Sequence, residues 1–110
     1  MFAISRGCKT INHERVDTFI RAIAGEDTLL EVEAGTNGFH GGGRQSGSRA
    51  YLRLTALNKA DLFVRVRSND AGQPVSVEIC FCGDDGLTAL MKALTFAGDA
   101  ITEQAYDQND

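Results

Sequence analysis

Residues 49–82 read RAYLRLTALNKADLFVRVRSNDAGQPVSVEICFC, and they contain three short segments in which apolar and polar side chains alternate. A period of two is typical of strands with one buried face, so we expect strands at Arg49–Leu57, Asp61–Ser68 and Pro74–Cys82. Turns rich in asparagine and glycine separate the three segments. Because the connections are short, this stretch predicts the centre of an antiparallel β-meander.

Outward from this stretch, the sequence adds further strands and two helices. Thr28–Ala34 alternates and predicts a fourth strand, and the apolar Met1–Ser5 predicts a short edge strand. Thr10–Ala24 predicts a helix, because Val16, Phe19, Ile20 and Ile23 fall at i, i+3, i+4 and i+7. A second, longer helix is predicted after Gly83, with one apolar stripe made of Leu87, Leu90, Met91, Leu94, Ala97 and Ile101.

The element order therefore predicts an α+β fold with two layers. One layer is an antiparallel β-meander of four to five strands, and the other is formed by the two amphipathic helices, which cover one face of the sheet. The length of 110 residues fits a single domain, residues 1–110, with a polar tail at 107–110.

Composition limits the classes of function. The formal net charge is −4, which makes nucleic acid an unexpected partner. No apolar run approaches the roughly 20 residues of a membrane span, so we expect a cytoplasmic protein without a membrane partner. The three cysteines, Cys8, Cys80 and Cys82, predict neither a disulfide scaffold nor a metal site. We expect them to be buried or half-buried thiols, and we expect no cofactor.

Period-two alternation divides the strand residues between two faces of the sheet. The uniformly apolar set is expected to face the helices, and it consists of Leu30, Val32, Ala34, Ala50, Leu52, Leu54, Leu62, Val64, Val66, Val75, Val77, Ile79 and Phe81. The other set is polar with two aromatic residues, and it consists of Glu31, Glu33, Arg49, Tyr51, Arg53, Phe63, Arg65, Arg67, Ser76, Glu78, Cys80 and Cys82.

The polar face has three interpretations. Arginines on its middle strands and glutamates on the flanking strands could simply form cross-strand ion pairs, each contributing about 0.2–1 kcal/mol. The face could instead be a binding platform, with arginines for phosphate or carboxylate and aromatic rings for stacking. It could also pair with a copy of itself, because arginine and aromatic residues are enriched at interfaces. The platform residues are Arg49, Tyr51, Arg53, Phe63, Arg65 and Arg67.

A glycine-rich loop at 35–48 precedes the arginine-bearing strands and contains six of the twelve glycines. Glycine allows the backbone to approach a ligand closely, and successive N–H groups can form an anion-binding nest. The loop leads into a strand, whereas known phosphate-binding loops lead into a helix. A loop of this length is either functional or a flexible connector. The binding residues expected in it are Phe39, His40, Gly41, Gly42, Gly43, Arg44 and Ser46.

No catalytic constellation can be placed by spacing. His40 could act as a general base, but a lone histidine in a glycine loop more often forms a hydrogen bond or stacks on a ring. Cys80 and Cys82 have no evident activating base. We therefore expect no catalytic residues and no enzyme activity, and a small hydrolase or transferase that uses His40 remains the third hypothesis.

The loop and the strand after it resemble a set of small uncharacterised bacterial and phage proteins. Their pattern is approximately T-x-G-[FY]-x-G-G-D-x-G-H-G-x-R-[TA]-Y, followed later by G-G-D and an amphipathic helix. The matching residues here are Thr36, Gly38, Phe39, Gly41, Gly42, Gly47, Arg49, Tyr51, Gly83 and Asp84. Gly43 and Ser46 replace the aspartate and the histidine of that pattern, so any role of those two groups does not transfer. The resemblance implies that the loop is important.

These observations lead to one main hypothesis about function. We expect a binding protein for a small, anionic, nucleotide-like ligand, and a phage origin would make sequestration of a nucleotide immune signal a specific role. The alternative is a protein-interaction module, such as an inhibitor of a host enzyme, that uses the arginine and aromatic face. The open polar face also predicts a homo-oligomer.

Overall fold

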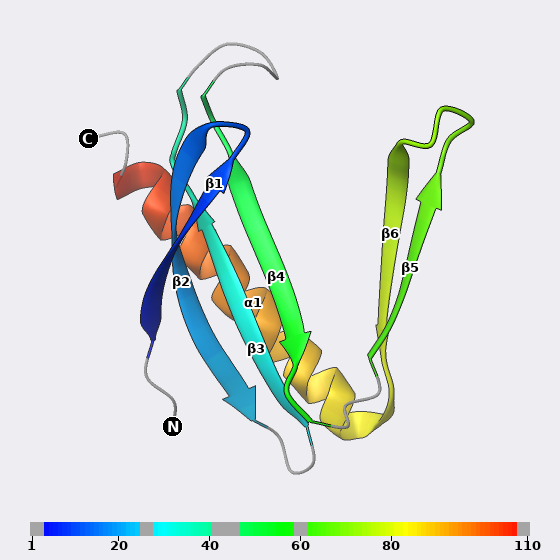
Figure 1. The fold of residues 1–110 in the computed structure, drawn as a ribbon. Coiled ribbons are helices and arrows are strands. Elements are labelled where there is room, and N and C mark those ends of the chain that lie inside the picture. The colour runs from blue at the N-terminus through cyan, green and yellow to red at the C-terminus, as the bar shows by residue number, and fades with distance from the viewer. Residues whose placement is uncertain (1–3, 25–27, 41–46, 59–61, 108–110) are drawn as a thin grey trace.

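The computed structural model describes residues 4–24, 28–40, 47–58 and 62–107. A four-stranded antiparallel sheet has the strand order β1-β2-β3-β4, and β5 pairs with β6 in a separate two-stranded sheet (Figure 1). The α+β class is confirmed, but the described residues contain one helix and not two. The elements are β1 (Ser5–Ile11), β2 (Glu14–Ala24), β3 (Leu29–Thr36), β4 (Ala50–Ala56), β5 (Leu62–Ser68), β6 (Pro74–Phe81) and α1 (Gly83–Asp107).

The helix predicted at Thr10–Ala24 is wrong, because this segment is the end of β1 and the whole of β2. Phe19 and Ile23 are four residues apart, a spacing that puts two side chains on one face of a helix and also of a strand. Both contribute to the core under α1, whereas Val16 and Thr18 are buried on the opposite face of β2. The first half of β2 buries one face and its second half buries the other. The apolar residues therefore do not alternate along the whole strand, and their spacing resembles that of an amphipathic helix.

The edge strand lies later in the chain than Met1–Ser5, and a two-residue turn joins it to β2. Ile11 pairs with Glu14, and Asn12 and His13 have φ angles of 47° and 73°. Two consecutive residues with positive φ are typical of the tight hairpin turn that matches the twist of antiparallel strands. Because this turn contains no glycine, the sequence gives little sign of it.

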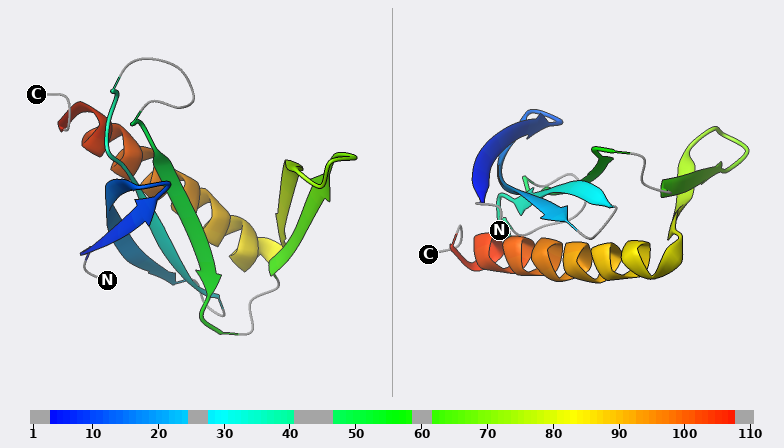
Figure 2. Two further views of the ribbon diagram at one scale, coloured as in Figure 1. Left: turned by 45° about the horizontal axis from the view of Figure 1, so that its top comes forward. Right: turned by 90° about the horizontal axis from the view of Figure 1, so that it is seen from below.

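The core lies between one face of the four-stranded sheet and α1, as Figure 2 shows. β3 supplies the centre of the sheet side with Leu30, Val32 and Ala34, and each of these three residues is fully buried. Small side chains of α1 allow the helix to approach the sheet closely. The buried core residues of the helix are Ala93, Phe96, Ala97 and Ala100. The predicted helix-facing role of the three β3 residues is confirmed.

The β5–β6 hairpin departs from the predicted continuous meander. It projects away from β4 and is connected to the rest of the chain at its base (Figures 1 and 2). The apolar face of this hairpin was expected to contact a helix, but both of its faces are exposed. Its five exposed aliphatic side chains are Val64, Val66, Val75, Val77 and Ile79. Period-two alternation identifies a face correctly but does not identify what covers it.

Candidate functional site

Asn37 organises the base of the glycine-rich loop. Its Nδ2 donates a hydrogen bond to the carbonyl of Gly47 at 2.6 Å, and its Oδ1 accepts one from the backbone N–H of Arg49 at 2.7 Å. The Thr36 hydroxyl donates to the carbonyl of Arg49 at 2.6 Å and accepts from the N–H of Gly38 at 3.0 Å. These bonds join the two ends of the loop, so its base is ordered. The sequence analysis missed Asn37 because its partners are ten or more residues away.

The loop base is also anchored on α1. Gln104, a buried residue near the end of the helix, accepts a hydrogen bond from the N–H of Thr36 at 3.1 Å. The ring of Phe39 lies 6.3 Å from the ring of Tyr106, in a tilted arrangement, and both rings are largely exposed. The helix therefore holds the start of the loop in place and leaves one aromatic pair open to solvent.

His40 has a structural role in this arrangement. Its Nε2 lies 2.9 Å from the carbonyl oxygen of Asn37, so the ring donates this hydrogen bond, and its backbone N–H donates to the Ser48 hydroxyl at 2.7 Å. The remaining predicted loop residues, Gly41, Gly42, Gly43, Arg44 and Ser46, lie outside the described residues.

Replacing Asn37 with alanine is expected to destabilise the loop base, because two backbone groups lose their partners. Each lost hydrogen bond contributes about 1 kcal/mol. Amide hydrogen exchange should show faster exchange at Arg49 in the variant. Asn69→Ala is the matched control, since the Asn69 side chain likewise forms two hydrogen bonds with the backbone, both as acceptor, but lies in the exposed β5–β6 turn. Equal exchange at Arg49 in the wild type and in Asn37→Ala would contradict the proposed role.

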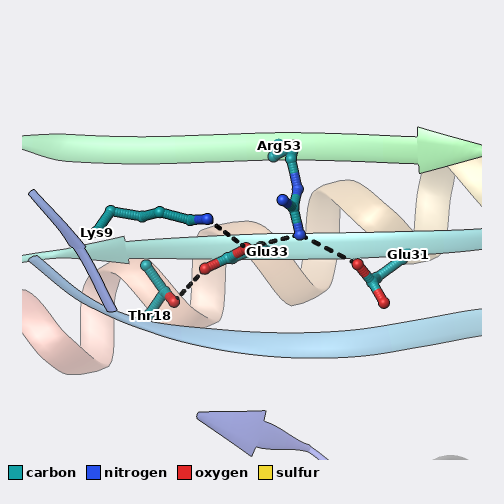
Figure 3. Close-up of polar contacts among 5 residues, drawn as sticks. All are labelled: Lys9, Thr18, Glu31, Glu33 and Arg53. Atoms are coloured by element: carbon teal, nitrogen blue, oxygen red, sulfur yellow. Dashed lines mark hydrogen bonds and ion pairs between the residues drawn. The ribbon is translucent and has the colours of Figure 1, made fainter. Parts of the chain in front are cut away.

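The polar face of the main sheet contains a compact ion-pair network (Figure 3). Arg53 Nη2 lies 3.1 Å from Glu31 Oε1 and 2.8 Å from Glu33 Oε1, and Lys9 Nζ lies 3.8 Å from the same Glu33 oxygen. Glu33 is only 2% exposed and also accepts a 2.6 Å hydrogen bond from the Thr18 hydroxyl. The polar face was expected to be open, but β1 covers the part of it that contains Glu33. The charge of Arg53 is already neutralised by its two glutamate partners.

The structure does not bring the whole predicted platform together. Tyr51 lies on the main sheet, with Lys9 Nζ 5.7 Å from the centre of its ring. Phe63, Arg65 and Arg67 lie on the separate β5–β6 hairpin, where Arg65 forms an exposed ion pair with Glu78 at 3.5 Å. Within one copy of the chain, these three hairpin residues do not share a sheet with Tyr51 and Arg53.

A groove of about 900 Å³ lies between the β1–β2 pair and α1, and the sequence analysis did not predict it. Three basic residues line it, Arg6, Arg21 and Lys92, together with the aromatic residues Phe19 and Phe96. The Arg6 guanidinium lies over the Phe19 ring, 5.3 Å from its centre. The groove combines positive charge with flat apolar surface, and its volume falls in the usual range for small-molecule sites.

The charges of this groove are not paired with each other. Asp99 and Glu103 also line it, but in the part of the chain that the structure describes no carboxylate forms an ion pair with Arg6, Arg21 or Lys92. The wrong helix at Thr10–Ala24 gave no sign of the groove, because a helix would place Arg21 on the face opposite Phe19 and Ile23, whereas in β2 all three line the groove. The three cations can still accept an anionic partner.

The described residues give no support for a cysteine-based site, a metal site or a membrane-spanning helix. All three cysteines are exposed thiols, which corrects the expected burial. No group of three His, Cys, Asp or Glu side chains among these residues could hold a metal ion. Over the same ranges, no helix has both the length and the apolar character that a membrane span requires. Comparisons with known protein families, curated proteins and solved structures found no match to this chain.

Proposed function

We propose that this chain is a cytoplasmic binding protein for a small anionic ligand with a flat ring, such as a nucleotide. The observation that carries the proposal is the set of three basic residues, Arg6, Arg21 and Lys92, around the aromatic walls of one groove. Arginine forms strong hydrogen bonds with phosphate and carboxylate groups, and aromatic rings stack on bases. The ligand would be bound and not converted, which suits a protein that sequesters a nucleotide signal, including one used in defence against phage.

The glycine-rich loop is the second location at which the same ligand could bind. Its base is anchored by Asn37 and Gln104, and the ring of Phe39 at the start of the loop is exposed to solvent. A phosphate would then be bound by backbone N–H groups of the loop. The two locations predict different effects of substitution, and one experiment separates them.

Thermal-shift measurements and calorimetry with mononucleotides, dinucleotides and cyclic nucleotides test the proposal. We expect at least one nucleotide to raise the melting temperature, and we expect Arg21→Ala to weaken its binding about tenfold or more, because a charge-assisted hydrogen bond is lost. Arg15→Ala is the matched control, since Arg15 lies on the same strand, outside the groove, in an exposed ion pair with Asp17.

The outcomes of this experiment are distinct. Loss of binding in Arg49→Ala with normal binding in Arg21→Ala would place the ligand at the loop. If no nucleotide stabilises the wild-type protein, the proposed ligand class is wrong. Equal losses in Arg15→Ala and Arg21→Ala would show a nonspecific effect of charge and would remove the groove as the site.

A further inference from the structure

The β5–β6 hairpin has no covering layer on either face in the described residues. Two-stranded hairpins without a covering layer are marginally stable in water, and every residue of this one from Phe63 to Cys80 is exposed. The radius of gyration of the chain is 15.3 Å, compared with about 13 Å for a compact domain of this length. The extended hairpin therefore needs a surface that covers it.

Helix α1 has an exposed apolar stripe of a matching kind. Leu87, Met91 and Leu94 are 56%, 61% and 60% exposed. Their spacing of four and three residues puts all three on one flank of the helix. The basic groove lies on the other flank, where Lys92, Thr95 and Asp99 face β2. The stripe thus lies on the side of α1 away from β2, toward the part of the molecule where β4 ends the sheet.

β4 also presents an unpaired edge. It pairs with β3 on one side, and in the described residues no strand pairs with its other side. The exposed Leu52 on this strand and the aliphatic face of the hairpin have the same character. Free edges of this kind are usually paired or covered in native proteins. One hairpin could cover both the free edge of β4 and the stripe of α1.

The hairpin of the same chain is directed away from these surfaces. Phe81, at the end of β6, packs against the core, and a Cβ on Gly86 would lie 3.0 Å from the Phe81 Cβ, so the junction with α1 is tightly packed. At the other end, Leu57 donates its N–H to the carbonyl of Leu29 at 2.9 Å, which fixes the end of β4. The hairpin lies apart from β4, as Figure 1 shows.

We propose that two copies of this chain exchange their β5–β6 hairpins. The hairpin of each copy packs its aliphatic face on the α1 stripe of the other copy, and its β5 pairs with the other copy's β4. The eight aliphatic side chains of the two surfaces expose an area of the order of the 800 Å² per partner that a stable interface buries. A reciprocal exchange has closed two-fold symmetry, which ends the assembly at a dimer.

The exchange has a consequence for the polar face. Any register that puts Val64 and Val66 toward α1 puts Phe63 and Arg65 on the opposite face, because successive residues of a strand point to opposite sides. Tyr51 and Arg53 of β4 lie on that face. The partner's Phe63 and Arg65 would then lie beside them, and the dimer would assemble the platform that one chain leaves divided. The proposed exchange does not depend on ligand binding in the groove.

Light scattering of the full chain at micromolar concentration tests the exchange, with Val77→Lys on the hairpin and Met91→Glu on the helix as variants. We expect the wild type to be a dimer and each variant alone to dissociate about 100-fold or more readily, because each buries an unpaired charge. Ser76→Lys is the matched control, since Ser76 adjoins Val77 on the polar face of β6, and it should remain dimeric.

Mixing the two variants makes the test specific. An equimolar mixture of Val77→Lys and Met91→Glu should recover dimers, because lysine and glutamate then meet across one of the two exchanged contacts. Recovery only when both substitutions are in one chain would show that each hairpin covers its own helix, and would overturn the proposal. A monomeric wild type, or an assembly larger than a dimer, would overturn it as well.

Discussion

A Gly35→Ala variant is expected to lose about 3 kcal/mol or more of folding free energy, because the backbone leaves no space for a side chain at this position. A Cβ there would overlap the carbonyl oxygen of Asp17 and lie 2.5 Å from Gln104 Oε1 and 2.8 Å from the Cα of Thr18. Two of these neighbours are backbone atoms of β2, so relief would require separation of β2 from β3. Urea unfolding followed by circular dichroism measures the loss.

Gly98→Ala is the matched control for this prediction. Gly98 lies in the middle of α1, and a Cβ built on it meets no atom within 4 Å. Alanine favours the helix over glycine by about 1 kcal/mol, so this variant should be more stable than the wild type. A Gly35→Ala protein with wild-type stability would mean that β2 and β3 do not pair as closely as described here.

The parts of the fold that could be predicted are those in which one face is buried along the whole element. β3 is of this kind, and its core residues Leu30 and Val32 were assigned to the correct face. The stripe predicted for α1 was correct only in part, because Ala97 lies in the core but Leu87, Met91 and Leu94 are exposed. β2 is not of this kind, because Val16 and Ile23 are buried on opposite faces of one strand. Local periodicity cannot separate this arrangement from an amphipathic helix.

The candidate site shows a second limit of sequence analysis. Period-two alternation correctly grouped Arg53 and Arg65 as polar-face residues, but they lie on two different sheets. The neighbours of a strand depend on tertiary packing, which the alternation does not encode. The groove was missed for the related reason that Lys92 of α1 is far in the sequence from Arg6 and Arg21, which lie on the β1–β2 hairpin.

The buried carboxylate of Glu33 leads to the second large prediction. This side chain is 2% exposed, and its oxygens are contacted by Lys9, Arg53 and the Thr18 hydroxyl. Burial of a carboxylate is unfavourable unless it is paired and hydrogen-bonded, and all three partners meet this requirement. A Cβ added to Gly7 would lie 2.9 Å from Glu33 Oε2, so β1 closes tightly over the group.

Glu33→Ala is therefore expected to destabilise the fold by about 2–4 kcal/mol, since it leaves two cations and a buried hydroxyl without their shared acceptor. The loss should be below the largest values for buried pairs, because Lys9 and Arg53 are 35% and 40% exposed and can be hydrated. Glu33→Gln should recover part of the loss, since its amide oxygen can still accept from Thr18. Urea unfolding of both variants measures the two effects.

Glu31→Ala provides the comparison that identifies burial as the cause. Glu31 pairs with the same Arg53 nitrogen at 3.1 Å and lies on the same strand, but its side chain is 32% exposed. Exposed and half-exposed ion pairs contribute about 1 kcal/mol or less, so this variant should lose much less stability than Glu33→Ala. Equal losses in the two variants would show that Arg53 alone determines the effect, and that the cover provided by β1 adds nothing to it.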